Sequence, residues 1–175
     1  MQRVGVDMFR VYRHCVIQTR VFSSSAVSCR NRAIVYTSHG DPSSTLFART
    51  FPSLPPPRPN SVNIRFLLAP INPADINVIE GVYPNKPAPS DLFGNAQTPV
   101  YVGGNEGLAE VVETGQGVSE LKTGDWVIMT KSQIGTWTSA RNVDAQDVLK
   151  VPSDLGEAAA ATITVCLVTC MAPVA

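Results

Sequence analysis

The sequence predicts a mainly β fold with short helices, closed in part into a barrel. Apolar residues make up 44% of the 175 residues, which is enough to build a core and excludes a disordered chain. Between residues 33 and 151, short apolar runs of strand length alternate with clusters of Gly, Pro, Asn and Asp. The 14 Lys and Arg balance the 14 Asp and Glu, so the whole chain has no charge excess of the kind that binds nucleic acid or anionic membranes.

The strands are predicted from apolar runs and their boundaries. Residues 33–37 form an apolar run that ends in a turn cluster at residues 38–42. Five prolines in residues 52–59 predict an extended, polyproline-like connector. Apolar and other residues alternate over residues 62–68, which is typical of a half-buried strand. Further strands are predicted over residues 107–114, 125–130, 134–140 and 147–151.

Two helices are predicted from capping residues. Asn72 precedes Pro73 and Asp75, an N-cap followed by the residues favoured in a first turn, and Gly81 ends this helix after two turns. Near the C-terminus, Ser153 or Asp154 is the predicted cap of a second helix over residues 158–161, with Glu157 at capping-box spacing from Asp154. Between the two helices, residues 84–104 are rich in Pro, Gly and Asn and predict a lid or binding loop.

Residues 158–175 carry no charge, and their length matches the threshold for a membrane span. The segment is rich in Ala and Thr and is interrupted by Pro173, so we expect a buried helix running into a core strand and no membrane span.

Residues 1–32 differ in composition from the rest of the chain. They contain six arginines and one acid, Asp7, followed by a serine cluster, which is typical of a mitochondrial transit peptide cut near Phe22. The alternative is a disordered basic tail of a cytosolic protein. The predicted organisation is therefore a transit peptide over residues 1–32, one domain over residues 33–157, and a helix start with a divergent tail over residues 158–175. Without the leader, the chain has a formal charge of −5.

The residue types that commonly hold metals or perform catalysis are sparse. The four cysteines (Cys15, Cys29, Cys166 and Cys170) and two histidines have no metal-ligand spacing, which predicts no metal site and a reducing compartment. Gly115-x-Gly117 is an incomplete dinucleotide fingerprint, with Glu120 where a third glycine is needed. Of the acidic residues Asp75, Glu80, Glu106, Glu110 and Glu113, most are expected on a solvated face.

Two strings carry a more specific signal: INPADIN (71–77) with GVYPNKP (81–87), and VGGNEGLAEVV (102–112) leading to LKTGDWV (121–127). With these strings the sequence resembles the mitochondrial 2-enoyl thioester reductases, also called enoyl-CoA or enoyl-acyl-carrier-protein reductases, of the medium-chain dehydrogenase/reductase superfamily. The resemblance runs from about residue 33 to residue 165. It implies the N-terminal part of a GroES-like, partly closed β-barrel catalytic domain.

The resemblance also implies a chemistry. The family transfers a hydride from NADPH to the β-carbon of an enoyl thioester and a proton to the α-carbon, and Tyr83 matches the tyrosine that supplies the proton or polarises the thioester oxygen. Asn72, Asn105, Glu106 and Trp137 are the candidate pocket residues. Asn72 and Asp75 are better interpreted as caps that orient the helix and the loop carrying Tyr83. For Asn105 and Glu106 a turn-structuring role is an equal alternative, and for Trp137 the alternative is an ordinary core position. Zinc relatives have Gly-His-Glu where this chain has Gly-Asn-Glu (104–106), so no zinc is expected.

The resemblance places the Rossmann domain after residue 165, where this sequence departs from the family. We therefore expect no NADPH-binding residues in these 175 residues, and no turnover by the chain alone in the mitochondrial matrix. Full-length members are expected to be homodimers that take enoyl-ACP or enoyl-CoA. Two alternatives remain: a zinc-independent NADPH quinone reductase, separable by comparing quinone with enoyl thioester turnover, and a non-catalytic module that binds acyl carrier protein or the full-length subunit, separable by pull-down from matrix extract.

Overall fold

The computed structural model describes residues 31–93 and 97–167. The predicted transit peptide and its cut site therefore lie almost wholly outside the described residues, as does the tail from residue 168. The described part is mainly β with short helices, as predicted, and no helix in it is long and apolar enough to cross a membrane.

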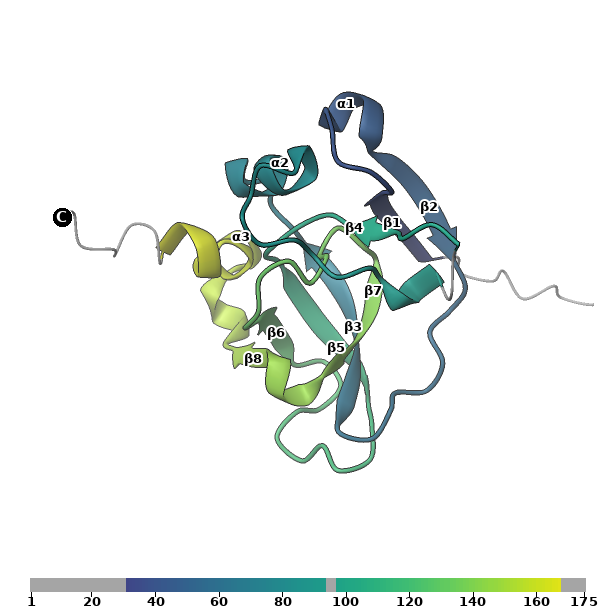
Figure 1. Cartoon of the computed structure of the whole chain (residues 1–175). Coiled ribbons are helices and arrows are strands. Elements are labelled where there is room, and N and C mark those ends of the chain that lie inside the picture. The colour runs from purple at the N-terminus through teal and green to yellow at the C-terminus, as the bar shows by residue number, and fades with distance from the viewer. Residues whose placement is uncertain (1–30, 94–96, 168–175) are drawn as a thin grey trace, which may run out of the picture.

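In residues 31–93 and 97–167, eight antiparallel strands form two sheets (Figure 1). The smaller sheet has the order β2-β1-β4, and the larger has the order β7-β3-β5-β6-β8. The smaller sheet consists of β1 (Asn31–Tyr36), β2 (Phe47–Phe51) and β4 (Tyr101–Val102). The larger sheet consists of β3 (Ser61–Leu68), β5 (Leu108–Thr114), β6 (Trp126–Met129), β7 (Ala140–Asp144) and β8 (Val148–Val151).

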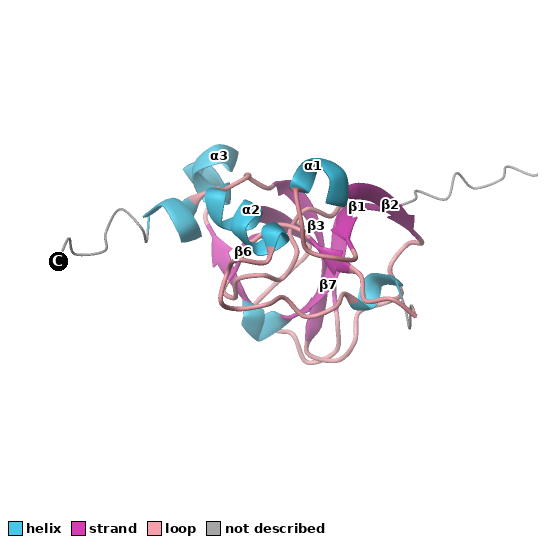
Figure 2. Ribbon diagram, turned by 45° about the horizontal axis from the view of Figure 1, so that its top comes forward, coloured by secondary structure: helices cyan, strands magenta, loops and turns pink. Residues whose placement is uncertain are grey.

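The helices are short and lie toward one side of the sheets (Figure 2). They are α1 (Pro42–Thr45), α2 (Pro73–Glu80) and α3 (Glu157–Ala161), and a π-helical turn (Ile163–Leu167) follows α3. Single 3-10 turns occupy Asp91–Phe93, Ala145–Asp147 and Ser153–Leu155.

Alternating apolar side chains of the larger sheet build the main core. Val62 and Ile64 of β3 pack with Val111 of β5 and Val127 of β6, and all four are fully buried. Their spacing of two residues along each strand directs them to one face, as the sequence pattern predicted. A second cluster lies around Val35 in the smaller sheet, and α3 covers a third that includes Leu108 and Ala160.

Three elements differ from their predictions. After α3 the described residues form a π-helical turn (Ile163–Leu167) and not the expected core strand. Residues 134–139 are not a strand. They cross between the two sheets, and Trp137 accepts a backbone hydrogen bond of 2.9 Å from Ile34 while β7 starts only at Ala140. The left-handed backbone of Gly135 (φ 82°) turns the chain there. The predicted capping box of the last helix is also absent: residues 153–155 form a 3-10 turn, and Gly156 precedes α3 without a side-chain cap. The sequence patterns did not predict α1, β2 or β4.

Candidate active site around α2

The start and end of α2 are fixed by the residues that predicted it. Asn72 and Asp75 form a capping box, in which the Asp75 carboxylate accepts a 2.7 Å hydrogen bond from the Asn72 N–H. Gly81 ends the helix in the left-handed conformation (φ 80°). A Cβ at Gly81 would lie 2.9 Å from the His39 side chain, so glycine is also required by the close approach of the segment after β1.

Asp75 is buried, with 1% of its surface exposed. Besides the Asn72 N–H, its carboxylate accepts a 2.6 Å hydrogen bond from the Asn105 side chain. Burial raises the pKa of Asp75 because the charged form loses its hydration, and the nearby Glu106 carboxylate raises it further, against the lowering effect of the hydrogen bonds. The solvated face that was expected for most of the five acidic residues therefore does not include Asp75 or Glu106.

Glu106 is buried as well, with 2% exposure, and joins three segments of the chain. One carboxylate oxygen accepts from the Asn72 amide at 2.9 Å. The other accepts from the Thr164 hydroxyl and the Val165 N–H, both at 2.8 Å. No cation lies within ion-pair distance of this carboxylate among the described residues, so neutral donors alone compensate its burial.

Trp137 packs against the glycines that precede Glu106. Its indole N–H donates a 3.0 Å hydrogen bond to the Pro70 carbonyl, and its ring lies so close to the backbone that a Cβ at Gly103 would approach it to 2.4 Å. Trp137 is half-buried and lies in the segment between the sheets. This packing corresponds to the alternative of an ordinary core residue, in which the indole N–H has a hydrogen-bond partner.

Tyr83 lies in the loop after α2. The residue is 37% exposed. Its backbone N–H donates to the Asn77 carbonyl of α2 at 3.2 Å. A second tie to this loop comes from Gln133, whose side chain donates to the Asn85 carbonyl at 3.0 Å.

The structure thus brings Asn72, Asn105 and Glu106 together through hydrogen bonds, with Asp75 between them. Asn105 also lines a cavity of ≈ 390 Å³ beside Met129, Lys131 and Thr164. Tyr83, Trp137, Asn72 and Glu106 do not line this cavity. The sequence patterns missed the burial of Asp75 and the contacts of Thr164 and Gln133, because those contacts join residues 28 to 59 positions apart.

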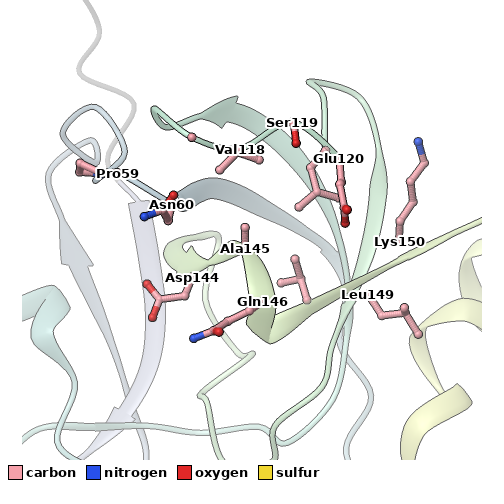
Figure 3. Close-up of a pocket in the computed structure, with 13 residues that line it drawn as sticks. Pro59, Asn60, Val118, Ser119, Glu120, Asp144, Ala145, Gln146, Leu149 and Lys150 are labelled. Atoms are coloured by element: carbon pink, nitrogen blue, oxygen red, sulfur yellow. The ribbon is translucent and has the colours of Figure 1, made fainter.

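A larger cavity of ≈ 850 Å³ lies at the other end of the larger sheet (Figure 3). Asn60, which precedes β3, and Asp144, at the end of β7, line it, whereas α2 follows the last residue of β3. Glu120 and Lys150 face the same cavity, and Lys150 forms an ion pair of 2.8 Å with Asp125. None of the predicted site residues contributes to it.

Neither a metal site nor a dinucleotide cradle is found in the described part of the chain. It contains no group of three His, Cys, Asp or Glu side chains placed to hold a metal ion. Gly115 lies in a turn where a Cβ would come within 2.1 Å of the Arg58 carbonyl oxygen, and at Gly117 it would come within 2.4 Å of the Asn60 side chain. These two glycines are needed for contact with the segment before β3, and the stretch lacks the third glycine of a dinucleotide fingerprint.

Comparison with known families decides the identity of this domain. Residues 58–165 match the profile of the alcohol dehydrogenase GroES-like domain. The chain belongs to this family. Within it, the sequence corresponds to the N-terminal GroES-like region of the mitochondrial enoyl-[acyl-carrier-protein] reductases of the medium-chain dehydrogenase/reductase superfamily, which confirms the predicted resemblance and fold.

The GroES-like chain is similar to several named reductases. It is 44% identical over 126 residues to enoyl-[acyl-carrier-protein] reductase 2, mitochondrial, of Candida tropicalis, covering 70% of this chain and 32% of the relative. It is 40% identical over 147 residues to the mitochondrial enzyme of Homo sapiens, covering 82% of this chain and 36% of the relative. The chain therefore spans about a third of the length of these relatives.

The chain is also similar to parts of solved reductase structures. The structure of the Etr1p/NADP/crotonyl-CoA complex has a TM-score of 0.73 and 38% identity, over 78% of the GroES-like chain and 40% of that chain. Escherichia coli quinone oxidoreductase complexed with NADPH has a TM-score of 0.59 and 27% identity, over 75% of this chain and 36% of that chain.

Proposed function

We propose that this GroES-like domain is the substrate-side part of an NADPH-dependent 2-enoyl thioester reductase of mitochondrial fatty-acid synthesis. The likeness to mitochondrial enoyl-[acyl-carrier-protein] reductases and to a structure holding NADP and crotonyl-CoA supports this function. The observation that carries the proposal is the loop with GVYPNKP (81–87), which presents an exposed tyrosine directly after α2. Hydrogen bonds among Asn72, Asp75, Asn105 and Glu106, the α2 cluster, hold this helix.

Tyr83 is the proposed proton donor. Reduction of an enoyl thioester needs a hydride at the β-carbon, which NADPH supplies when bound, and a proton at the α-carbon. A phenol has an ordinary pKa of about 10 and stays protonated near neutral pH, so it can donate a hydrogen bond to the thioester oxygen or deliver the proton. The Tyr83 side chain is accessible for this role because 37% of the residue's surface is exposed.

Asn72, Asn105 and Glu106 are proposed to support the pocket, because their side chains are engaged with each other, with Asp75 and with Thr164. Their hydrogen bonds hold α2, and thereby the Tyr83 loop that follows it, in one orientation. Trp137 is proposed to border the acyl chain. Without a dinucleotide cradle in the described residues, NADPH is proposed to bind to another part of the enzyme.

A chimera tests the function. Residues 31–165 replace the matching residues of the Candida tropicalis reductase, and NADPH oxidation is followed with crotonyl-CoA. We expect turnover, and a loss of about 100-fold in Tyr83→Phe, the lower end for loss of a positioned proton donor. Tyr101→Phe is the matched control. A folded chimera in which Y83F and Y101F behave alike contradicts the role of Tyr83.

The quinone reductase is the second candidate, favoured by the likeness to the Escherichia coli quinone oxidoreductase. The same chimera distinguishes the two, because a quinone reductase turns over a quinone with NADPH and leaves crotonyl-CoA unreduced. The 175-residue chain alone is expected to oxidise NADPH at the background rate with either substrate.

The proposed location is the mitochondrial matrix, because the similar reductases of Candida tropicalis and Homo sapiens are mitochondrial. Incubation of the full chain with isolated, energised mitochondria is expected to shorten it by roughly 20–30 residues at the predicted transit peptide. A chain that stays outside and uncut contradicts this location. The proposed substrate is enoyl-ACP or enoyl-CoA, and the proposed assembly of the full-length enzyme is a homodimer.

A further inference from the structure

Gln133 has an unusual backbone conformation. Its φ angle is 58°, in the left-handed region that a residue with a Cβ atom adopts only at a cost. Such a conformation persists when neighbouring contacts hold it, and it is common at functional positions.

The backbone of Gln133 is tied to the interior of the α2 cluster. Its N–H donates a 3.0 Å hydrogen bond to the side-chain oxygen of Asn105. The amide nitrogen of the same Asn105 side chain donates to the buried carboxylate of Asp75 at 2.6 Å. Asn105 thus uses both ends of its amide, which leaves it one orientation and fixes the position of Gln133 relative to α2.

The side chain of Gln133 reaches in the opposite direction, to the exposed loop. Its amide nitrogen donates a 3.0 Å hydrogen bond to the carbonyl of Asn85, two residues after Tyr83. The loop's other polar ties run to α2 or its end: Tyr83 N–H donates to the Asn77 carbonyl, and the Lys86 amine donates to the Gly81 carbonyl. Among the described residues, Gln133 is the one whose hydrogen bond connects the loop of residues 82–86 to a part of the fold other than α2 and its end.

We propose that Gln133 is a positioning residue for Tyr83: it connects the buried Asp75–Asn105 pair to the loop that carries the phenol, and so restricts where that phenol lies. The positioning role rests on the proposed function, because it matters for catalysis only if Tyr83 is the proton donor. The tether itself depends only on the hydrogen bonds of Gln133.

Hydrogen exchange of the full 175-residue chain tests the tether. Gln133→Glu keeps the length of the side chain but removes the N–H that donates to Asn85, and Gln133→Asn keeps the amide but is too short to reach. Both are expected to speed exchange of the Tyr83 amide about 5-fold, the factor that corresponds to one neutral hydrogen bond. Exchange of the Val111 amide in β5 should not change.

Gln116→Glu and Gln116→Asn are the matched controls, since Gln116 is exposed in the turn after β5 and its side chain makes no described hydrogen bond. They are expected to leave Tyr83 exchange unchanged. If Q133E and Q133N also leave the exchange rate of the Tyr83 amide unchanged, Gln133 does not hold the loop, whether or not Tyr83 is the proton donor.

Turnover of the chimera separates the tether from the proposed function. Q133N is expected to lower kcat with crotonyl-CoA several-fold, and to have no further effect in a chimera that already carries Y83F, because Gln133 acts through Tyr83. Independent, multiplying losses overturn the positioning role. If Q133N speeds loop exchange but Y83F leaves turnover intact, the tether stands and the proposed role of Tyr83 fails.

Discussion

Glu106 offers the sharpest test of how the site is held together. Its buried carboxylate accepts hydrogen bonds from the Asn72 amide, the Thr164 hydroxyl and the Val165 N–H at 2.8–2.9 Å. Replacing Glu106 with Gln keeps the size of the side chain but turns one acceptor oxygen into a donor. The Thr164 hydroxyl can turn to accept from the new amide, whereas the Val165 N–H can only donate.

The magnitude follows from this count of donors. Glu106→Gln loses one hydrogen bond to a charged acceptor and leaves one N–H without a partner, which costs about 2 kcal/mol of unfolding free energy. Glu106→Ala removes all three hydrogen bonds and opens a space. We expect about 4 kcal/mol, less than three full hydrogen bonds, because the alanine variant no longer buries a charge and water can enter.

Urea unfolding of the 175-residue chain, followed by the fluorescence of Trp126 and Trp137, measures these losses. Glu120→Gln is the matched control, because Glu120 is exposed in a turn and the same substitution there should change the unfolding free energy by less than 0.5 kcal/mol, as is usual for surface sites. If E106Q also falls within about 0.5 kcal/mol of the parent chain, the Glu106 carboxylate does not hold the three segments together.

Three further predictions concern the packing around the site, and all are read from unfolding free energies in urea. Gly104→Ala should cost at least about 2 kcal/mol more than Gly124→Ala, because both have left-handed φ angles (97° and 91°) but a Cβ meets a side-chain atom at 2.3 Å only at Gly104; equal costs would contradict this. Burial raises the pKa of the Tyr36 hydroxyl to about 12, with a smaller effect of a neighbouring tyrosine, so the unfolded chain ionises first as pH rises. The contribution of the protonated phenol to the unfolding free energy is therefore complete below pH 10 and is lost between about pH 10 and 12. This loss of about 3 kcal/mol should be absent in Tyr36→Phe, which has no hydroxyl to ionise. Trp137→Phe should cost about 1–2 kcal/mol, because the Pro70 carbonyl loses its 3.0 Å hydrogen bond; no loss would show that this bond contributes nothing.

Much of the fold could be predicted from local signals. The alternation in β3 and the capping residues of α2 describe interactions within a few residues of each other, so these two elements were predicted to within one residue. The segment over residues 134–139 was predicted as a strand from its composition and is not one. The backbone of this segment bonds to Ile34, which is about 100 residues earlier in the chain, and Gly135 turns the chain in the left-handed conformation. Neither feature can be recognised from a few neighbouring residues of the sequence.

The site divides in the same way. The motif strings identified Asn72, Asn105 and Glu106 as a group, and the structure joins them by hydrogen bonds. The same strings could not indicate that Asp75 is buried, since an acid in the first turn of a helix is ordinarily solvated. Its burial follows from the packing of α2 against the loop with Asn105.

By itself, the sequence determined the family, the mainly β class and the identity of the residues around α2, because repeated apolar spacing, capping residues and motif strings are local properties of the chain. The tertiary structure decided what those residues do. Glu106 and Asp75 became buried acceptors, Trp137 became a packing partner of two glycines, and Gln133 became the link to the Tyr83 loop. Each of these roles depends on a hydrogen bond or contact between segments about 30 or more residues apart, and only the folded chain brings such segments within 3 Å of each other.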